Sequence, residues 1–306
     1  MYLFRIHIRP GGGEADMPTT FAYCLKQGFL GVGWRVNSVR NTKNWESYYA
    51  AASKEHGKLN VCQYIKDWVS KGDLVWTRDT HGQYYLARVS SGWEYWSCDE
   101  AGEKDIDIAN IFRCDTRPVH IDAVPGKVVA CFRAPRTIQE VKCDSAREYS
   151  KFLWNVLADG EVYQIDDTLC NDVFMLLDDE ETEDLLFLFL QSKGWYVIPN
   201  SRKKDTMSFE YLVVRPESGE IAAAQVKTGG STLNRDDYVH LPHRVFLFQA
   251  NDLYQGNEAA NVTCVSRKEL RGFLSEARSW LPEVLRTKLS LAEQGPALTR
   301  KLALTE

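Results

Sequence analysis

The chain has 306 residues, of which 44% are hydrophobic and 26% charged, so it can bury at least one sizeable core, and its length suggests two domains. The formal net charge of −5 excludes a protein that binds nucleic acid through its overall charge, and any such binding must use local basic patches. No stretch approaches the roughly 18 consecutive apolar residues of a membrane span, and the N-terminus lacks a signal-peptide layout, so we expect a cytoplasmic protein without membrane contact.

The first half of the chain, residues 2–133, predicts short strands that alternate with helices and form a first domain, 1–133. The expected strands are rich in aromatic and β-branched residues and lie between glycine turns: 2–8, 74–78, 84–89, 93–96 and 128–132. The expected helices fall between the first two of these strands: 21–27, 44–53 and 61–70.

Three segments of this half carry a resemblance: Gly-Val-Gly-Trp at 31–34, Gly-Asp-Leu-Val-Trp at 72–76 and Tyr-Leu-Ala-Arg-Val at 85–89. They resemble the PUA-like barrels, including the EVE and YTH domains, which read modified or flipped bases. The resemblance implies a β-barrel with helices, whose aromatic residues near the mouth would stack on an extruded base with about 1–3 kcal/mol per base. The candidates, for each of which core filling is the alternative, are Trp34, Trp76, Trp93, Tyr95 and Trp96.

Residues 134–171 are expected to join the two halves through a helix over 137–154. The second domain then covers 172–294, and residues 295–306 should form a flexible tail.

The second half opens with an acidic run that begins a helix around Glu183, followed by an apolar stretch over 185–190. Strands are expected at 194–199, 209–215, 221–227 and 244–248. Ser266 and Glu269 have the spacing of a capping box, and Pro282 permits a further helix start. These last helices should cover one face of the sheet.

Eight scattered cysteines with no Cys-x-x-Cys spacing argue against a zinc site and against a disulfide framework. The most informative polar residues lie instead in the hairpin 209–227. If Arg215 pairs with Glu220 across the turn, antiparallel counting places Glu210 opposite Gln225, with Cβ atoms roughly 5 Å apart. Lys227 then follows on the same face. Such groups in an apolar sheet cost several kcal/mol unless they hold each other or a ligand, and a divalent cation would supply the missing partner.

This pattern resembles the restriction-endonuclease-like, or PD-(D/E)xK, superfamily, and within it the Mrr-like nucleases that carry Gln-x-Lys, over roughly residues 175–275. The resemblance implies a mixed sheet flanked by helices. It makes Glu210 and Gln225 ligands of Mg²⁺ or Mn²⁺, Lys227 the catalytic lysine, and Glu183 an accessory acid. Asp205 is a competing candidate for the first metal ligand. The chain departs from the family pattern in having Glu for Asp at 210 and the uncharged Gln at 225.

Each candidate also has a structural interpretation. Lys227 could be a snorkelling side chain, Glu210 and Gln225 an ordinary cross-strand hydrogen bond, and Glu183 a solvated acid at a helix start. A basic run before the hairpin could approach a phosphate backbone or form a solvated loop: Arg202, Lys203 and Lys204.

The sequence therefore predicts a two-domain α/β (α+β) protein and favours a cytoplasmic, magnesium-dependent DNA endonuclease of the modification-dependent or anti-phage restriction type. Double-strand cleavage by one active site per chain would call for a homodimer. Two alternatives stay open: a nucleic-acid-binding sensor that has lost catalysis, and an RNA-directed nuclease.

Overall fold

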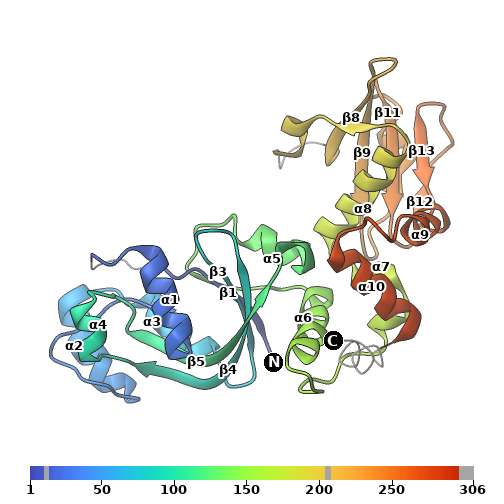
Figure 1. Ribbon diagram of the computed structural model, residues 1–306. Coiled ribbons are helices and arrows are strands. Elements are labelled where there is room, and N and C mark those ends of the chain that lie inside the picture. The colour runs from blue at the N-terminus through green and yellow to red at the C-terminus, as the bar shows by residue number, and fades with distance from the viewer. Residues whose placement is uncertain (10–13, 204–207, 296–306) are drawn as a thin grey trace. The chain divides into compact units, whose positions relative to one another are not determined.

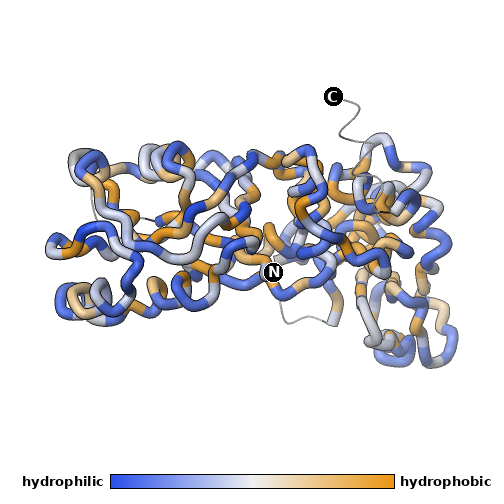
Figure 2. The backbone as a smooth tube through the Cα atoms, turned by 90° about the horizontal axis from the view of Figure 1, so that it is seen from below, coloured by the Kyte–Doolittle hydropathy of each residue, from blue (hydrophilic) through white to orange (hydrophobic). Residues whose placement is uncertain are grey.

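The structure is a computed structural model that describes residues 1–9, 14–203 and 208–295 (Figure 1). The chain divides into two compact units, Met1–Ile165 and Asp166–Leu298, each built from mixed sheets and helices. The hydropathy colours along the chain are shown in Figure 2, and the buried hydrophobic residues of both units fall on the strands and on the helices that pack against them. Over the described residues, no helix combines the length and the apolar character that a bilayer crossing requires.

The first unit contains a six-stranded sheet in the order β2-β5-β4-β3-β1-β6. Its strands are β1 (Leu3–Ile6), β2 (Phe29–Val32), β3 (Leu74–Arg78), β4 (Tyr84–Tyr95), β5 (Asn110–Val119) and β6 (Ile138–Glu140). Among these described strands, β1 and β3 pair in parallel and the other neighbours are antiparallel. The strands expected at 84–89 and 93–96 are one long strand, β4, whose register shifts between Val89 and Trp93.

The expectation of a closed barrel is not met, because the described residues form an open sheet with β2 and β6 at its edges. The strand expected at 128–132 is instead the helix α5 (Gly126–Cys131), in which Val128 and the following Phe132 are buried at helical spacing. The single helix expected over 137–154 is divided into β6, which pairs with β1, and α6 (Asp144–Leu157). These segments belong to the first unit.

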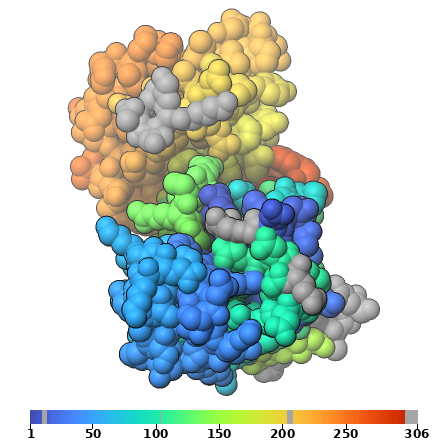
Figure 3. All heavy atoms as spheres, turned by 90° about the vertical axis from the view of Figure 1, so that its left-hand side faces the viewer, coloured from blue at the N-terminus to red at the C-terminus, as the bar shows by residue number. Residues whose placement is uncertain are grey.

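Helices cover both faces of this sheet. The remaining ones are α1 (Met17–Gln27), α2 (Trp45–His56), α3 (Asn60–Trp68), α4 (Asp99–Glu103) and the 3-10 turn η1 (Ile121–Ala123). One face forms a core with α1, α2 and α3, in which Phe4, Tyr48 and Ile65 are buried. The opposite face meets α6, where the indole Nε1 of Trp76 donates to Ser150 Oγ at 3.0 Å. The blue and light-blue atoms, which include those of α2 and α3, form much of the face of the first unit that Figure 3 shows.

The second unit contains a five-stranded sheet in the order β13-β11-β9-β8-β7. Its strands are β7 (Tyr196–Val197), β8 (Tyr211–Arg215), β9 (Glu220–Lys227), β11 (Arg244–Gln249) and β13 (Val262–Val265). The pairs of β8 with β7 and β9 are antiparallel, whereas those of β11 with β9 and β13 are parallel. A small parallel pair, β10 (Leu233–Asn234) and β12 (Tyr254–Gln255), lies apart from this sheet. Two candidate residues, Gln225 and Lys227, therefore lie on β9, the central strand between β8 and β11.

The helical segments of this unit are η2 (Leu169–Asn171), α7 (Val173–Leu176), α8 (Asp179–Ser192), η3 (Pro199–Lys203), η4 (Arg235–Asp237), α9 (Arg267–Glu276) and α10 (Glu283–Gln294). The expected capping box at Ser266 and Glu269 is confirmed at the start of α9. A second capping box, Asp178 with Glu181, begins α8. Helix α8 packs against β9 and α9, so its first turns are fixed next to the hairpin β8–β9.

Candidate active site

The β8–β9 hairpin has the register that the sequence predicts. Arg215 pairs with Glu220, and Gly219 takes a φ of 69° in the turn, where a residue without Cβ is favoured. Extending this register places Glu210 opposite Gln225, and the Glu210 backbone N–H donates to Ala224 O at 2.8 Å. The local sequence therefore brings the first carboxylate next to the end of β9.

Three polar side chains converge at this point. Gln225 is 3% exposed, and its Nε2 donates to Glu210 Oε1 at 2.8 Å and to Val226 O at 3.1 Å. The Lys227 ammonium lies 3.8 Å from the same Glu210 oxygen, and its side chain is 45% exposed. The buried Gln225 carboxamide and the exposed Lys227 ammonium, two residues apart on β9, thus both approach the Glu210 carboxylate.

Glu183 lies on α8, half-buried, and the structure gives it an unusual electrostatic setting. Burial first and the Glu210 charge second raise the pKa of the Glu183 carboxyl to about 8. Among the described residues no ion pair or hydrogen bond involves this carboxylate. Glu183 lies after the first turn of α8 and its capping box of Asp178 and Glu181, and its side chain is half-buried, which differs from a solvated acid at a helix start. A divalent cation placed near both carboxylates would relieve the repulsion between Glu183 and Glu210.

The donor set fits a hard divalent cation. Glu183 and Glu210 offer carboxylate oxygens, and Gln225 offers a carboxamide oxygen if its amide is turned, since the two ends of an amide are assigned from their hydrogen bonds. Mg²⁺ binds oxygen ligands and keeps several waters, so this set suffices. Across residues 1–9, 14–203 and 208–295, no cluster of three or more His, Cys, Asp or Glu side chains suits a metal ion. A cation bound by Glu183 and Glu210 would therefore also need the Gln225 carboxamide and water as ligands.

The basic run before the hairpin is described only in part. Arg202 Nη2 lies 2.5 Å from Asp184 Oδ1, and its guanidinium sits 5.5 Å from the Phe187 ring and 5.8 Å from the Tyr211 ring. Arg202 is therefore held against α8. The Lys203 side chain, Lys204 and the competing metal candidate Asp205 lie outside the described residues.

One residue that the sequence analysis missed is Gln249, the last residue of β11, which pairs with Lys227 and is fully buried. Its Nε2 donates to Gly229 O and Ser231 O, both at 2.9 Å, and its Oε1 accepts from Asn251 N. Gln249 therefore fixes the loop that follows Lys227. The signal in the sequence was a glutamine at the end of an apolar strand, where a buried amide needs partners.

Three of the predicted base-stacking residues are buried in the first unit. Trp76 is 0% exposed and faces α6, whereas Tyr95 at 1% and Trp93 at 8% belong to the opposite core. The Tyr95 hydroxyl bonds to the backbone of Val36, and Trp93 Nε1 donates to Asn110 Oδ1 at 3.0 Å. In this conformation their rings have no free face, and the structure does not gather them at one mouth.

The other two aromatic candidates are half-buried. Trp34 has a φ of 64°, a conformation rare for a bulky residue, and its carbonyl accepts from the Tyr48 hydroxyl at 3.0 Å. The Trp96 ring lies 4.4 Å from the Arg113 guanidinium carbon, which covers one of its faces. Both residues lie at the border of the core that contains Trp93 and Tyr95.

Comparison with known proteins gives no match to this chain among family models, curated proteins or solved structures. We call the group formed by the side chains of Glu183, Glu210, Gln225 and Lys227 the hairpin site.

Proposed function

We propose that the protein is a metal-dependent DNA endonuclease with a restriction-endonuclease-like core, in which the hairpin site hydrolyses phosphodiester bonds. One observation carries the proposal: Gln225 and Lys227 both approach Glu210, while burial and Glu210 raise the pKa of Glu183 to about 8. Such a perturbed acid beside a lysine and a second carboxylate is characteristic of functional sites.

Glu183, Glu210 and Gln225 would hold Mg²⁺ or Mn²⁺, which supplies Lewis-acid polarisation of the phosphate and lowers the pKa of bound water. Lys227 is exposed enough to reach a substrate, and its ammonium can stabilise negative charge that develops on the phosphate or orient the attacking water. Without a cation, the Gln225 amide holds the Glu210 side chain in place through its 2.8 Å hydrogen bond, and turning the amide would exchange this bond for a metal ligand.

The substrate we propose is cytoplasmic DNA, either plain or modified, as expected for an anti-phage or modification-dependent restriction enzyme. The first unit would serve as a sensing module that selects the site. Cleavage of both strands would need two hairpin sites, which makes a homodimer the expected active assembly.

The test is a cleavage panel of plain, methylated and hydroxymethylated phage DNA, with Mg²⁺, with Mn²⁺ and with a chelator. We expect divalent-dependent cleavage that Lys227→Ala reduces at least about 100-fold, because electrostatic stabilisation of the developing charge is lost. Lys268→Ala, at an exposed position of α9, is the matched control and should cut like the wild type. Absence of cleavage of every substrate, or full activity in Lys227→Ala, would contradict the proposal.

A second candidate is a nucleic-acid-binding sensor without catalysis. The observation that favours it is the Gln225 amide, which already satisfies Glu210 without any cation. Retention of DNA by the purified protein in a gel-shift assay, with no cleavage under any metal condition, would select the sensor. RNA of the same sequence, run in parallel, distinguishes an RNA-directed nuclease.

A further inference from the structure

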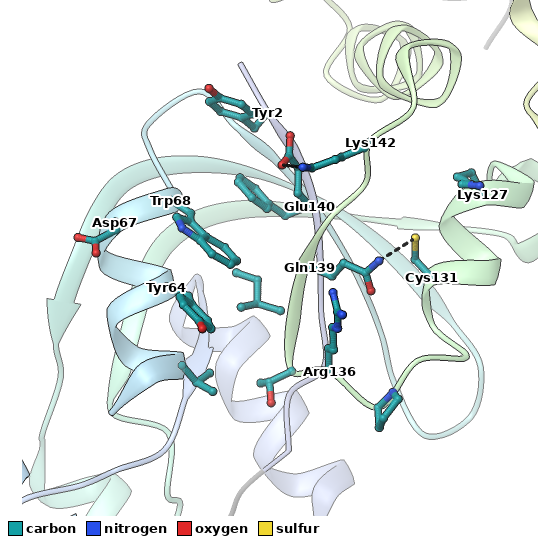
Figure 4. Close-up of a pocket in the computed structure, with 15 residues that line it drawn as sticks. Tyr2, Tyr64, Asp67, Trp68, Lys127, Cys131, Arg136, Gln139, Glu140 and Lys142 are labelled. Carbon is teal, nitrogen blue, oxygen red and sulfur yellow. Dashed lines mark hydrogen bonds and ion pairs between the residues drawn. The ribbon is translucent and has the colours of Figure 1, made fainter. Parts of the chain in front are cut away.

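A groove of about 1160 Å³ in the first unit belongs to neither the hairpin site nor the predicted aromatic residues (Figure 4). It follows the edge strand β6 (Ile138–Glu140), with α3 on one side and α5 on the other. The labelled side chains in Figure 4 show that Tyr64 and Trp68 line the α3 side, whereas Lys127 and Cys131 line the α5 side.

The floor of the groove is an unpaired sheet edge. β6 pairs with β1 alone, and the bonds from His7 N to Thr137 O and from Val141 N to Leu3 O show that its odd-numbered residues face β1. In an antiparallel ladder the backbone groups of alternate residues point to opposite sides. The N–H and C=O groups of Ile138 and Glu140 therefore point away from β1, and no partner for them exists among the described residues.

The α3 side of the groove is an exposed aromatic surface. The Tyr64 and Trp68 rings stack at 4.3 Å between centroids with an interplanar angle of 11°, and the two residues remain 39% and 41% exposed. Val61, Phe4 and Ile138 also line the groove. Paired aromatic rings left open to solvent next to a free strand edge can pack a large apolar side chain.

Positive charge lies around the middle of the groove. Arg136 is exposed, its side chain runs along the groove toward Gln139, and no described carboxylate pairs with it (Figure 4). Beneath the strand, Arg5 is 0% exposed and bonds only to backbone carbonyls and to Gln139 Oε1, at 3.0 Å, while its Nε has no partner. A buried guanidinium without a carboxylate partner contributes positive potential at the nearby surface, which attracts an anionic group.

We infer that this groove binds an extended peptide, which adds to β6 as a further strand of the sheet. The free backbone groups of Ile138 and Glu140 would hydrogen-bond the peptide main chain, an aromatic or large aliphatic side chain would pack on Tyr64 and Trp68, and an acidic side chain would face Arg136. A single strand brings no helices of its own, whereas the edge of a second copy would bring its α3 and α5 against those of the first copy. This inference does not depend on the nuclease proposal.

A nucleic acid fits the groove less well. Aromatic rings and an arginine could receive bases and phosphates, but Asp67 and Glu140 also line the groove and would repel a phosphate backbone. Nucleic acid also makes no use of a row of outward strand groups. The peptide uses both the free edge and the positive charge.

The experiment selects binders from a displayed library of random ten-residue peptides on the full-length protein and measures the enriched peptides by fluorescence anisotropy. Glu140→Pro removes an outward N–H while leaving the bonds to β1, since proline is tolerated at such edge positions. Glu140→Ala is the matched control, because it removes the same side chain and keeps the N–H. We expect Glu140→Pro and Trp68→Ala each to lower the affinity for the peptide at least about 10-fold. Arg136→Glu should lower the affinity for acidic peptides by a similar factor. Glu140→Ala should change the affinity less than about 3-fold.

Methylation of alternate backbone nitrogens of the selected peptide gives a second test that does not alter the protein. One set of methyl groups should abolish binding and the other should leave it unchanged, because only alternate peptide N–H groups face β6. Three results would overturn the inference: no enriched peptide, equal binding by Glu140→Pro and Glu140→Ala, or occupation by another partner. Occupation by a second copy would appear as a dimer in light scattering that Glu140→Pro dissociates. Occupation by nucleic acid would appear as saturable binding of a fluorescent ten-nucleotide oligothymidine that requires Trp68 and displaces the peptide.

Discussion

The carboxyl of Glu183 has the residue-scale property with the clearest measurable consequence. Its pKa in the folded protein is about 8, above the ordinary glutamate value of 4.5, because of burial and the Glu210 charge. Between these values the folded state keeps a proton that the unfolded chain has lost. This group therefore favours folding at low pH, and its contribution is lost as the pH rises through about 8.

Glu183→Gln removes this titration, so without metal its melting temperature should exceed that of the wild type by a few degrees at pH 9 and by less than about 1 °C at pH 5. Thermal unfolding followed by circular dichroism in chelator measures the difference. The control Glu276→Gln, at an exposed site on α9, should show no such divergence. An equal shift at both pH values would mean that the carboxyl does not titrate in this range.

At the scale of elements, α8 and α10 are joined by a buried ion pair. Lys288 is 0% exposed, and its Nζ lies 2.5 Å from Glu181 Oε2, an oxygen that also accepts from Asp178 N at 2.9 Å. Removal of one partner of a buried pair leaves the other charged in a poorly solvated place. The pair therefore couples the helix that carries Glu183 to the last described helix.

Lys288→Met should lower the free energy of unfolding by about 3–5 kcal/mol, measured by urea titration. Adding Glu181→Gln should recover part of this loss, because the neutral amide can still accept the Asp178 N–H without carrying a charge. Lys268→Met, at an exposed position, should change stability by less than about 0.5 kcal/mol. A double variant as unstable as the sum of its two single variants would refute the coupling.

Elements whose signals are local were predictable from the sequence. The turn after Arg215 set the hairpin register, and this register brought Glu210 next to Gln225 as predicted. The capping box at Ser266 likewise depends on neighbouring residues alone. These features follow from hydrogen bonds and side-chain alternation within a few residues.

Elements defined by distant partners were not predictable in this way. β6 is three residues long and is a strand because β1, more than 130 positions earlier, offers it an edge. A run of apolar residues such as 128–132 suits a strand or a helix until its neighbours are known, and here it is helical. Burial of Trp76 is equally a property of the packed sheet, since α6 closes over that face.

At the scale of the whole molecule, the division into units predicts which fragments fold. The first unit extends to Ile165 and includes β6 and α6, which cover β1 and the Trp76 ring. A fragment of residues 1–165 should therefore unfold cooperatively, whereas 1–133 should expose apolar surface and aggregate. Urea unfolding and light scattering of both fragments provide the comparison, and a 1–133 fragment as stable as 1–165 would contradict it.

All four residues of the hairpin site lie in the second unit. The raised pKa of Glu183 implies that the activity of the proposed enzyme would depend on pH. A cation that binds between Glu183 and Glu210 must displace the proton that Glu183 retains at neutral pH. Ion uptake would then acidify an unbuffered solution, and calorimetric heats of magnesium titration would vary with the ionisation enthalpy of the buffer. A fall in pH would release magnesium from the hairpin site and lower the cleavage rate. Protons would therefore compete with magnesium for this site.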